Sequence, residues 1–381
     1  MGTAWLYSLF VFGFAATQVL GSHWEQGAPD ALADALFAAI GFASLLSVGL
    51  QLYQLLDGSH LGLAVMWSPQ ERPFANLGQP NQLATLQIWG LLGLLWGFER
   101  SSLRGEIAVF AAVFLLIGIA LTGSRTASVG LALLFMFVIV QRKLWRFTLL
   151  PQVSGGLALV YVGLVLFSTE WITWILNGSA GADLGSRWSQ AGLRLPMWNA
   201  MLEAIAARPW VGWGVGQVGA AQMAVALAHP NLGHTYSYAH TLIIDACLWL
   251  GIPIGSIVLT ALSCWVVCLF RRLANACDAV LFMTLVVVGN HAMFEMPLYY
   301  AYFLLPLGLF MGILQMRVSA PVLLKMPRHV VIALFLALAA IWGTLLRDCA
   351  RVEVAFASLE NEWQRIQIIE PPQPPILVML D

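Results

Sequence analysis

Charged residues are scarce in this chain. Lys, Arg, Asp and Glu make up 10% of its 381 residues, whereas soluble globular proteins carry about 25%. Hydrophobic residues make up 60%, and the mean hydropathy is +0.81. The formal net charge of −1 gives no reason to expect a nucleic-acid partner. This composition excludes an ordinary soluble domain and predicts an all-α, polytopic membrane protein.

Motifs for metals and disulfides are also lacking. The five cysteines form no CxxC pair and no Cys/His cluster, so we expect neither a metal site nor a disulfide framework. A removable secretory signal is not predicted, because residues 1–20 lack a basic segment and a clear cleavage site. We interpret those residues as the first membrane span.

The chain has instead a series of apolar runs, each long enough to cross a bilayer. We predict about ten spans, at residues 3–20, 31–55, 83–98, 106–123, 126–141, 147–168, 241–270, 278–294, 299–316 and 329–346. Basic residues cluster in alternate loops, at 99–104, 141–146 and 271–272 and at Arg317, Lys325 and Arg328. By the positive-inside rule these loops are cytoplasmic, which leaves the long loop 169–239 on the opposite side.

Polar and aromatic residues gather in the loop 169–239. Within it, residues 195–206 carry apolar side chains at helical spacing and predict a short amphipathic helix on the membrane surface, with Arg194 at its beginning. Pro209 and the glycines of 212–216 predict a stop followed by a tight turn. Arg194 is either a snorkelling surface arginine or a functional cation. The tryptophans of the loop either lie at the membrane interface or stack on sugar rings.

His240 and Asp245 stand at the head of the predicted span 241–270. The positive end of the helix dipole favours a neutral imidazole at His240 and attracts phosphate; alternatively, His240 only caps the helix. Asp245 lies about 140° around the helix from His240, so it is not an i,i+4 partner. An acid at that depth is costly and usually paired. We expect it to face an inward polar cavity, with Arg125 as one candidate partner.

Five segments, in this order along the chain, resemble one family of bacterial proteins. They are "ANLGQPNQLATL" (75–86), "LTGSRTASVGLAL" (121–133), "RLPMWNAMLEAIAARPWVGWGVG" (194–216), "AHTLIIDACLWLGIPIG" (239–255) and "NHAMFEMPLYYAYFLLPLGLFMG" (290–312). Together they resemble the O-antigen ligase / Wzy polymerase superfamily of bacterial inner-membrane glycosyltransferases. The last segment looks most like the protein (pilin) O-oligosaccharyltransferase branch.

The resemblance implies an enzyme with its active face in the periplasm. Such enzymes transfer an oligosaccharide en bloc from undecaprenyl pyrophosphate to a hydroxyl, by inversion and without a metal or another cofactor. The expected acceptor is a Ser or Thr of a pilin-like protein. Ligation to lipid A core and O-antigen polymerisation are alternatives. A transporter or flippase is more remote, since it predicts internal repeats, which the sequence does not show. Membrane lipid is the remaining expected partner.

The resemblance also assigns roles to three residues. His240 heads its helix as the family's histidine does, although Thr241 and the "GIPIG" turn depart from the usual pattern. Arg194 stands four residues before Trp198, as the family's arginine does before its tryptophan. Both are expected to be catalytic, with His240 either removing the acceptor proton or orienting the pyrophosphate. Arg125 corresponds to the arginine of the family's "SRT" motif.

Arg125 and Arg187 are expected to bind the pyrophosphate, because arginine offers forked donors that stay protonated. The substrate cavity is expected to be lined by Asn76, Gln79, Asn81, Asp245, His291 and Glu295. Glu295 should hold an arginine or bind the acceptor, since His291 and Glu295 alone are too few ligands for a metal. We assign 1–346 to a transmembrane ligase/polymerase domain and 347–381 to a short periplasmic tail or a truncated C-terminal domain.

Overall fold

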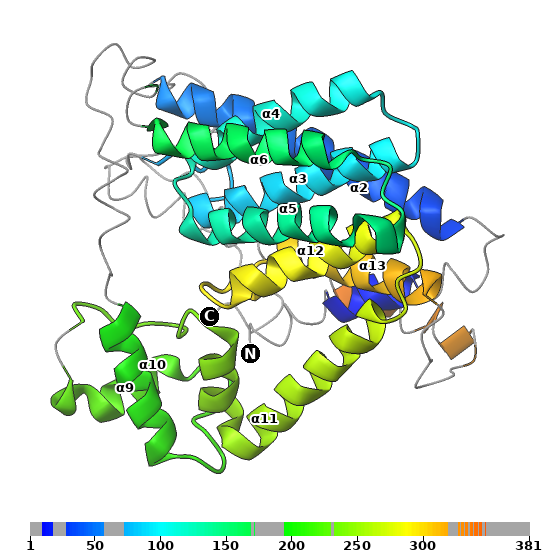
Figure 1. Cartoon of the computed structure of the whole chain (residues 1–381). Coiled ribbons are helices and arrows are strands. Elements are labelled where there is room, and N and C mark those ends of the chain that lie inside the picture. Colours follow the sequence, from blue (N-terminus) through cyan, green and yellow to red (C-terminus); the bar gives the residue numbers. More distant parts are fainter. Residues whose placement is uncertain are drawn as a thin grey trace, which may run out of the picture.

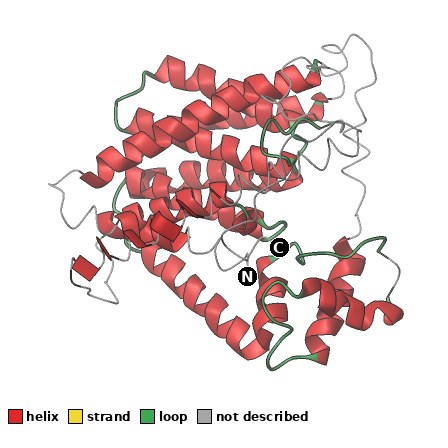
Figure 2. Cartoon of the chain, turned by 180° about the vertical axis from the view of Figure 1, so that it is seen from behind, coloured by secondary structure: helices red, strands yellow, loops and turns green. Residues whose placement is uncertain are grey.

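A computed structural model describes residues 10–17, 28–56, 72–168, 171, 194–229, 232–318, 327 and part of 329–347. Within these ranges every regular element is a helix, as Figure 2 shows. The main helices are α2 (Ala28–Leu55), α3 (Pro80–Glu99), α4 (Gly105–Leu121), α5 (Arg125–Trp145), α6 (Pro151–Leu166), α9 (Arg194–Ala207), α10 (Val218–Val225), α11 (Leu242–Phe270), α12 (Ala276–Ala292) and α13 (Ala301–Arg317). The predicted all-α class is confirmed.

Helices α2 to α6 pack with α12 and α13 into one bundle (Figure 1). Helix α3 is central, because it contacts α2, α4, α5 and α12. Its fully buried Trp89 meets Phe303 and Phe310 of α13 edge to face, with ring centroids 5.5 Å apart in both pairs. Such aromatic pairs add about 0.5–1.5 kcal/mol beyond area burial, and they hold α3 and α13 in a fixed relation.

One end of the bundle is tied by ion pairs. Arg100, just after α3, bonds Asp30 at 2.7 Å and Asp34 at 3.0 Å, both on α2. Arg317 at the end of α13 bonds Asp30 as well and lies 2.7 Å from Asp278 at the start of α12. Arg100 and Arg317, two of the basic residues predicted to share one side of the membrane, therefore meet at one end of the bundle. That this end is cytoplasmic stays a prediction.

The predicted spans agree with the helices that the structure describes. Eight of the ten coincide with α2 to α6 and α11 to α13 within four residues at each end, and the first and last are only partly described. Three helical segments, Asp30–Leu55, Arg125–Trp145 and Leu242–Phe270, are long and apolar enough to cross a membrane by themselves. The others are shorter or less apolar, so the number of membrane spans stays a prediction.

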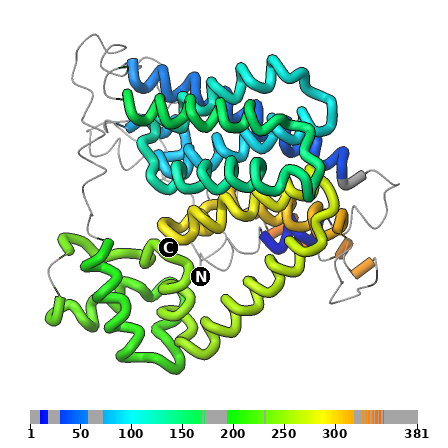
Figure 3. Tube along the Cα trace, viewed as in Figure 1, coloured from blue at the N-terminus to red at the C-terminus, as the bar shows by residue number. Residues whose placement is uncertain are grey.

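Helices α9 and α10 and the first part of α11 form a second unit beside the bundle (Figure 3). The unit has its own apolar core, which includes Met197, Met201, Val218 and Trp249. Among the helices, α9 contacts both α10 and α11. The described part of the long loop is therefore a packed structure that α11 connects to the bundle.

The predicted helix after Arg194 is present as α9. Its location on the membrane surface stays a prediction. Leu195 and Leu202 are 57% and 55% exposed, whereas Met197 and Met201 are fully buried. The helix begins and ends as predicted because these limits depend on local proline signals. Its buried face is made of small and flexible residues, including Ala200 and Ala204, which fit the close approach to α10 and α11.

Helix α11 is broken at Gly251, where the "GIPIG" sequence stands. Gly251 has φ +76° and ψ 166°, which an L side chain rarely adopts, and Pro253 follows. The glycine turn after α9 fills this break: the N–H of Trp213 donates to the Leu248 carbonyl at 2.6 Å, and the N–H of Ile252 donates to the Pro209 carbonyl at 2.7 Å. A Cβ at Gly251 would collide with the backbone of Trp210. The break therefore fixes α9 against α11.

Candidate active site

Glu295 is the centre of the candidate site. It follows α12 in the turn 293–296, and its side chain is 6% exposed. One carboxylate oxygen accepts from the Arg194 guanidinium, and the other lies 2.6 Å from Nδ1 of His240. Nδ2 of Asn81 donates to the same carboxylate at 3.3 Å. The structure thus brings four predicted site residues together from α3, α9, the α11 start and the α12 end.

The backbone at His240 is held in an uncommon conformation. Its φ is +56°, a left-handed value that costs a non-glycine residue about 1–3 kcal/mol. Two side chains hold the preceding peptide: Asp245 Oδ1 accepts from the N–H of Ala239 at 2.9 Å, and Trp198 Nε1 donates to the Ala239 carbonyl at 2.9 Å. These contacts aim the imidazole at Glu295.

Asp245 has a backbone partner in this arrangement. It is fully buried, as an acid at that depth should be. Its Oδ1 accepts from the backbone N–H of Ala239, and its lining of a substrate cavity stays a prediction. Arg125 is exposed at the first position of α5. Asp245 therefore shapes the turn that presents His240, which explains an acid so close to the head of a membrane helix.

The Glu295 carboxyl has a pKa below its usual value. Burial alone would raise that pKa, but the hydrogen bond and charge of His240 and the charges of Arg194 and His291 lower it more. An ionised Glu295 accepts a hydrogen bond from Nδ1–H of His240 and thereby leaves Nε2 as the basic nitrogen. The same carboxylate stabilises an imidazolium once Nε2 takes a proton.

Aromatic side chains surround the imidazole. The Tyr238 ring lies 4.7 Å from the His240 ring and 5.3 Å from the Tyr299 ring, and the Tyr236 ring lies 5.9 Å from His240. Burial, followed by nearby Tyr300, Glu295 and Asp245, raises the pKa of Tyr238 to about 12. Tyr238 therefore keeps its proton and is a hydrogen-bond donor beside His240, not a competing base.

Arg72 is a cation that sequence reasoning missed. It precedes α3, and its Nε donates to the Thr122 carbonyl at 2.6 Å. Its Nη2 is buried with no hydrogen-bond partner among the described residues. Burial and then Arg125 lower its pKa, while Glu295 raises it, so Arg72 lies within electrostatic reach of both Arg125 and Glu295. Its position three residues before the segment 75–86 was a signal that could have found it.

The remaining predicted residues differ in their placement. His291 is 1% exposed, and its Nδ1 lies 2.8 Å from Oγ1 of Thr85, so it joins α12 to α3 next to Glu295. Gln79 precedes α3 without making a side-chain cap, and Asn76 is exposed; their lining of a cavity stays a prediction. Arg187 lies outside the described residues. In the described part of the chain, no three His, Cys, Asp or Glu side chains are grouped to hold a metal ion.

Three family models match segments that each contribute to this site. Residues 110–259 match the O-antigen ligase model and include Arg125, Arg194 and His240. Residues 279–367 match the C-terminal part of a virulence factor membrane-bound polymerase and include Glu295. Residues 73–96 match a protein glycosylation ligase and include Asn81. The chain is thus similar to O-antigen ligases over 110–259 and to related membrane glycosylation and polymerase proteins over the two flanking segments.

Two curated relatives from Acinetobacter baylyi place the chain more narrowly. A general O-oligosaccharyltransferase is 29% identical over 96% of this chain and 66% of its own length. A ComP-specific O-oligosaccharyltransferase is 30% identical over 63% of this chain and 43% of its own length. The chain thus spans just under two thirds of the first relative and under half of the second. Both of these similar proteins are O-oligosaccharyltransferases.

Proposed function

We propose that this chain transfers an oligosaccharide en bloc from a lipid pyrophosphate, undecaprenyl pyrophosphate, to a Ser or Thr hydroxyl of a protein at the periplasmic face of the inner membrane. The observation that supports this most is the Glu295 carboxylate that joins His240 to Arg194. It holds the imidazole that we propose as the base beside the guanidinium that we propose binds phosphate. Both named relatives are O-oligosaccharyltransferases, which supports a protein acceptor.

The reaction needs a proton acceptor for the attacking hydroxyl. Nε2 of His240 removes that proton as the hydroxyl oxygen attacks the anomeric carbon, and Glu295 stabilises the resulting imidazolium. The bond between the anomeric carbon and the phosphate oxygen breaks on the opposite face of the sugar, so the configuration inverts. Tyr238 keeps its proton and can donate to the acceptor or to a sugar hydroxyl.

The leaving pyrophosphate needs fixed positive charge. Arg194 uses one nitrogen of its fork for Glu295, and its side chain is 34% exposed, so its other donors can bind a phosphate oxygen. Arg72 adds a further cation within electrostatic reach of Glu295, and Arg125 is within reach of Arg72. Preorganised guanidinium groups stabilise the negative charge that develops on a leaving phosphate, and in this proposal they do so without a metal ion.

The test compares two histidines in cells that make an undecaprenyl-linked glycan and a pilin-like acceptor. The His240→Ala variant should lose glycan transfer while its level in the membrane stays normal. The His229→Ala variant is the matched control. His229 also pairs with a glutamate, because its Nε2 lies 2.7 Å from the carboxylate of Glu203, but it is not a partner of Glu295. Full transfer by His240→Ala would refute the proposed base.

Ligation of a glycan to lipid A core, or polymerisation of O-antigen, is the second candidate function. The match of 110–259 to an O-antigen ligase and of 279–367 to a polymerase favours it. The donor and the residues with proposed roles would be the same. Supplying the same cells with a lipid A core acceptor in place of the pilin-like protein separates the two, because only the true acceptor gains sugar.

A further inference from the structure

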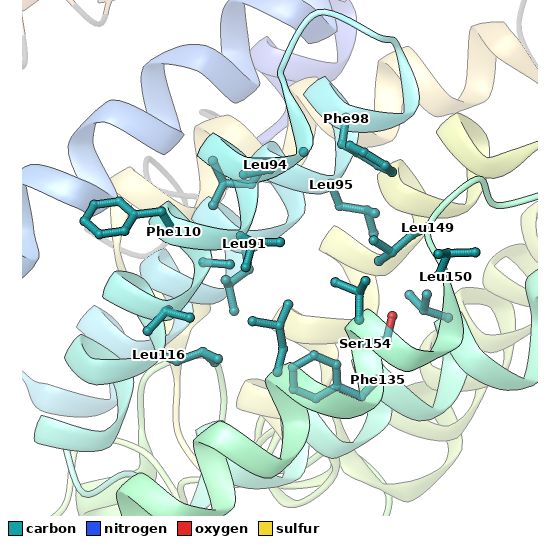
Figure 4. A pocket seen from close by; sticks show the side chains of 18 of the residues that line it. Leu91, Leu94, Leu95, Phe98, Phe110, Leu116, Phe135, Leu149, Leu150 and Ser154 are labelled. Atoms are coloured by element: carbon teal, nitrogen blue, oxygen red, sulfur yellow. The ribbon is translucent and has the colours of Figure 1, made fainter.

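A cavity of about 750 Å³ lies between α3, α4, α5 and α6, away from the candidate active site. Figure 4 shows Leu91, Leu94 and Leu95 of α3 facing Phe135 of α5 across it. Its lining is apolar except for Glu106, Thr148 and Ser154. Asn81 lies at the other end of α3, about 15–25 Å along the helix from the α3 residues of the lining at 1.5 Å per residue. The cavity is therefore no part of the site around Glu295.

The dimensions of the cavity match a lipid chain in one leaflet. Its lining runs along α4 from Gly105 to Leu116, which corresponds to about 16 Å of helix. Half of a bilayer's hydrocarbon core is about 15 Å. Phe110 and Leu150, at the edge of the cavity, are 78% and 54% exposed. The cavity is open on this side, toward the surface that lipid would cover.

Two hydroxyls lie at one end of this apolar lining. Ser154, in the first turn of α6, is 1% exposed, and its hydroxyl has no hydrogen-bond partner among the described residues. Figure 4 shows its oxygen turned toward the cavity. Thr148 lies nearby in the loop before α6 and is held by the Glu99 carboxylate at 2.9 Å. An unpaired buried hydroxyl costs free energy unless a partner arrives, and Ser154 can donate to an ester carbonyl at this depth.

Cations flank the same end. Arg104 precedes α4 and is exposed next to Gly105 and Glu106 of the lining. Arg142 donates through Nε to the carbonyl of Leu149, another lining residue, at 3.1 Å. Arg146 is exposed two residues before Thr148. The order along the bundle is therefore guanidinium groups, then hydroxyls, then an apolar chamber, which parallels phosphate, ester and acyl chain in a phospholipid.

We propose that this cavity binds one acyl chain of an anionic phospholipid from the leaflet at the basic end of the bundle. The lipid phosphate lies against Arg104, Arg142 and Arg146, and an ester carbonyl accepts from Oγ of Ser154. Glu99 does not oppose the phosphate, because its carboxylate accepts from the N–H groups of Thr148 and Leu149. This lipid site is independent of the proposed transfer reaction.

The first experiment fills the cavity with a larger side chain. The full chain is purified from membranes in mild detergent, and its bound phospholipid is measured by native mass spectrometry. Ala108→Trp places an indole in the lining, whereas Ile107→Trp places one on the adjacent exposed position of α4 outside the lining. We expect the bound phospholipid to persist with Ile107→Trp and to disappear with Ala108→Trp. Equal occupancy in both variants would overturn the proposal.

The second experiment tests the charges and does not disturb the core. The double variant Arg104→Glu/Arg146→Glu is compared with Arg271→Glu, an exposed arginine elsewhere, after exchange into vesicles of phosphatidylglycerol and phosphatidylethanolamine. Each cation lost should reduce the preference for phosphatidylglycerol roughly fivefold, since a basic residue near anionic lipid contributes about 1 kcal/mol. An unchanged preference, or recovery of a polyprenyl lipid as the only bound chain, would refute an anionic phospholipid.

Discussion

Replacing Glu295 with Gln tests the link between His240 and Arg194. Glutamine keeps the volume of the side chain and one carbonyl oxygen, but it removes the charge. Its amide nitrogen can donate toward Nδ1 of His240, which turns the imidazole into the tautomer with the proton on Nε2. In that tautomer Nε2 is no longer basic, so the proposed proton transfer fails.

The size of the effect follows from the two bonds that are lost. A hydrogen bond to a charged group contributes about 1.5–3 kcal/mol. The His240 bond is well buried, with the two side chains 20% and 6% exposed, and takes the upper part of that range. The Arg194 side chain is 34% exposed, and solvent screening reduces its share. Their sum of about 3–4.5 kcal/mol corresponds to a loss of about 10²- to 10³-fold in kcat.

The assay measures transfer of a lipid-linked glycan to acceptor by purified protein in liposomes. Glu203→Gln is the matched control, because Glu203 also pairs with a histidine at 2.7 Å but outside the candidate site. It should retain activity within a few-fold, and both variants should be recovered from membranes in equal amounts. A Glu295→Gln variant that keeps more than about a tenth of the wild-type kcat has lost less than roughly 1.4 kcal/mol. That result would contradict the proposed link between His240 and Arg194.

Arg194→Lys keeps the charge but loses the fork, so kcat should fall by about 10²-fold, measured in the same assay. Arg72→Gln should raise KM for the donor by roughly tenfold, while Arg72→Lys restores part of the loss, if a phosphate binds there. Asp245→Ala should lower kcat by about 10²-fold, whereas Asp245→Asn, which can still accept from Ala239, should stay near wild type. The folded-state pKa of Glu295 is depressed, so its stabilising contribution is present above its usual value of about 4.3 and is lost as pH falls through the lower folded value. Thermal unfolding of wild type and Glu295→Gln should therefore converge only below about pH 4, and convergence near neutral pH would contradict this sign.

Much of the fold could be predicted because membrane helices are local features. Apolar length located eight helices, and proline and glycine signals located the limits of α9. The core face of α9 was not predictable, since it depends on how closely α10 and α11 approach. The break at Gly251 was visible only as a turn in the sequence, because the loop that fills it comes from residues 209–214.

Single residues of the candidate site could also be predicted from local sequence, whereas the contacts between them could not. His240 and Arg194 could each be found separately. His240 stands at the head of the predicted span 241–270, and Arg194 stands at the beginning of the predicted helix 195–206. Glu295 was expected to hold an arginine or bind the acceptor. Which arginine it holds, and its contact with His240, could not be predicted, because Glu295 lies 55 residues from His240 and 101 from Arg194 along the chain. The backbone partner of Asp245, the N–H of Ala239, was not predicted because only side-chain partners were considered. Short polar side chains near helix starts often bind the backbone in this way.

The position of Glu295 sets a condition on how a donor could enter. Trp198 and the turn in the α11 break connect Arg194 and His240 within one unit, while Glu295 belongs to the bundle through α12. A pyrophosphate that binds Arg194 must share its guanidinium with Glu295 or displace that carboxylate. Sharing keeps the Nδ1 proton of His240 in place and so keeps Nε2 basic, whereas displacement would remove the group that fixes the tautomer. Catalysis by His240 therefore requires the donor to use the outer nitrogens of Arg194 and the nearby Arg72, with Glu295 still bonded between the two units.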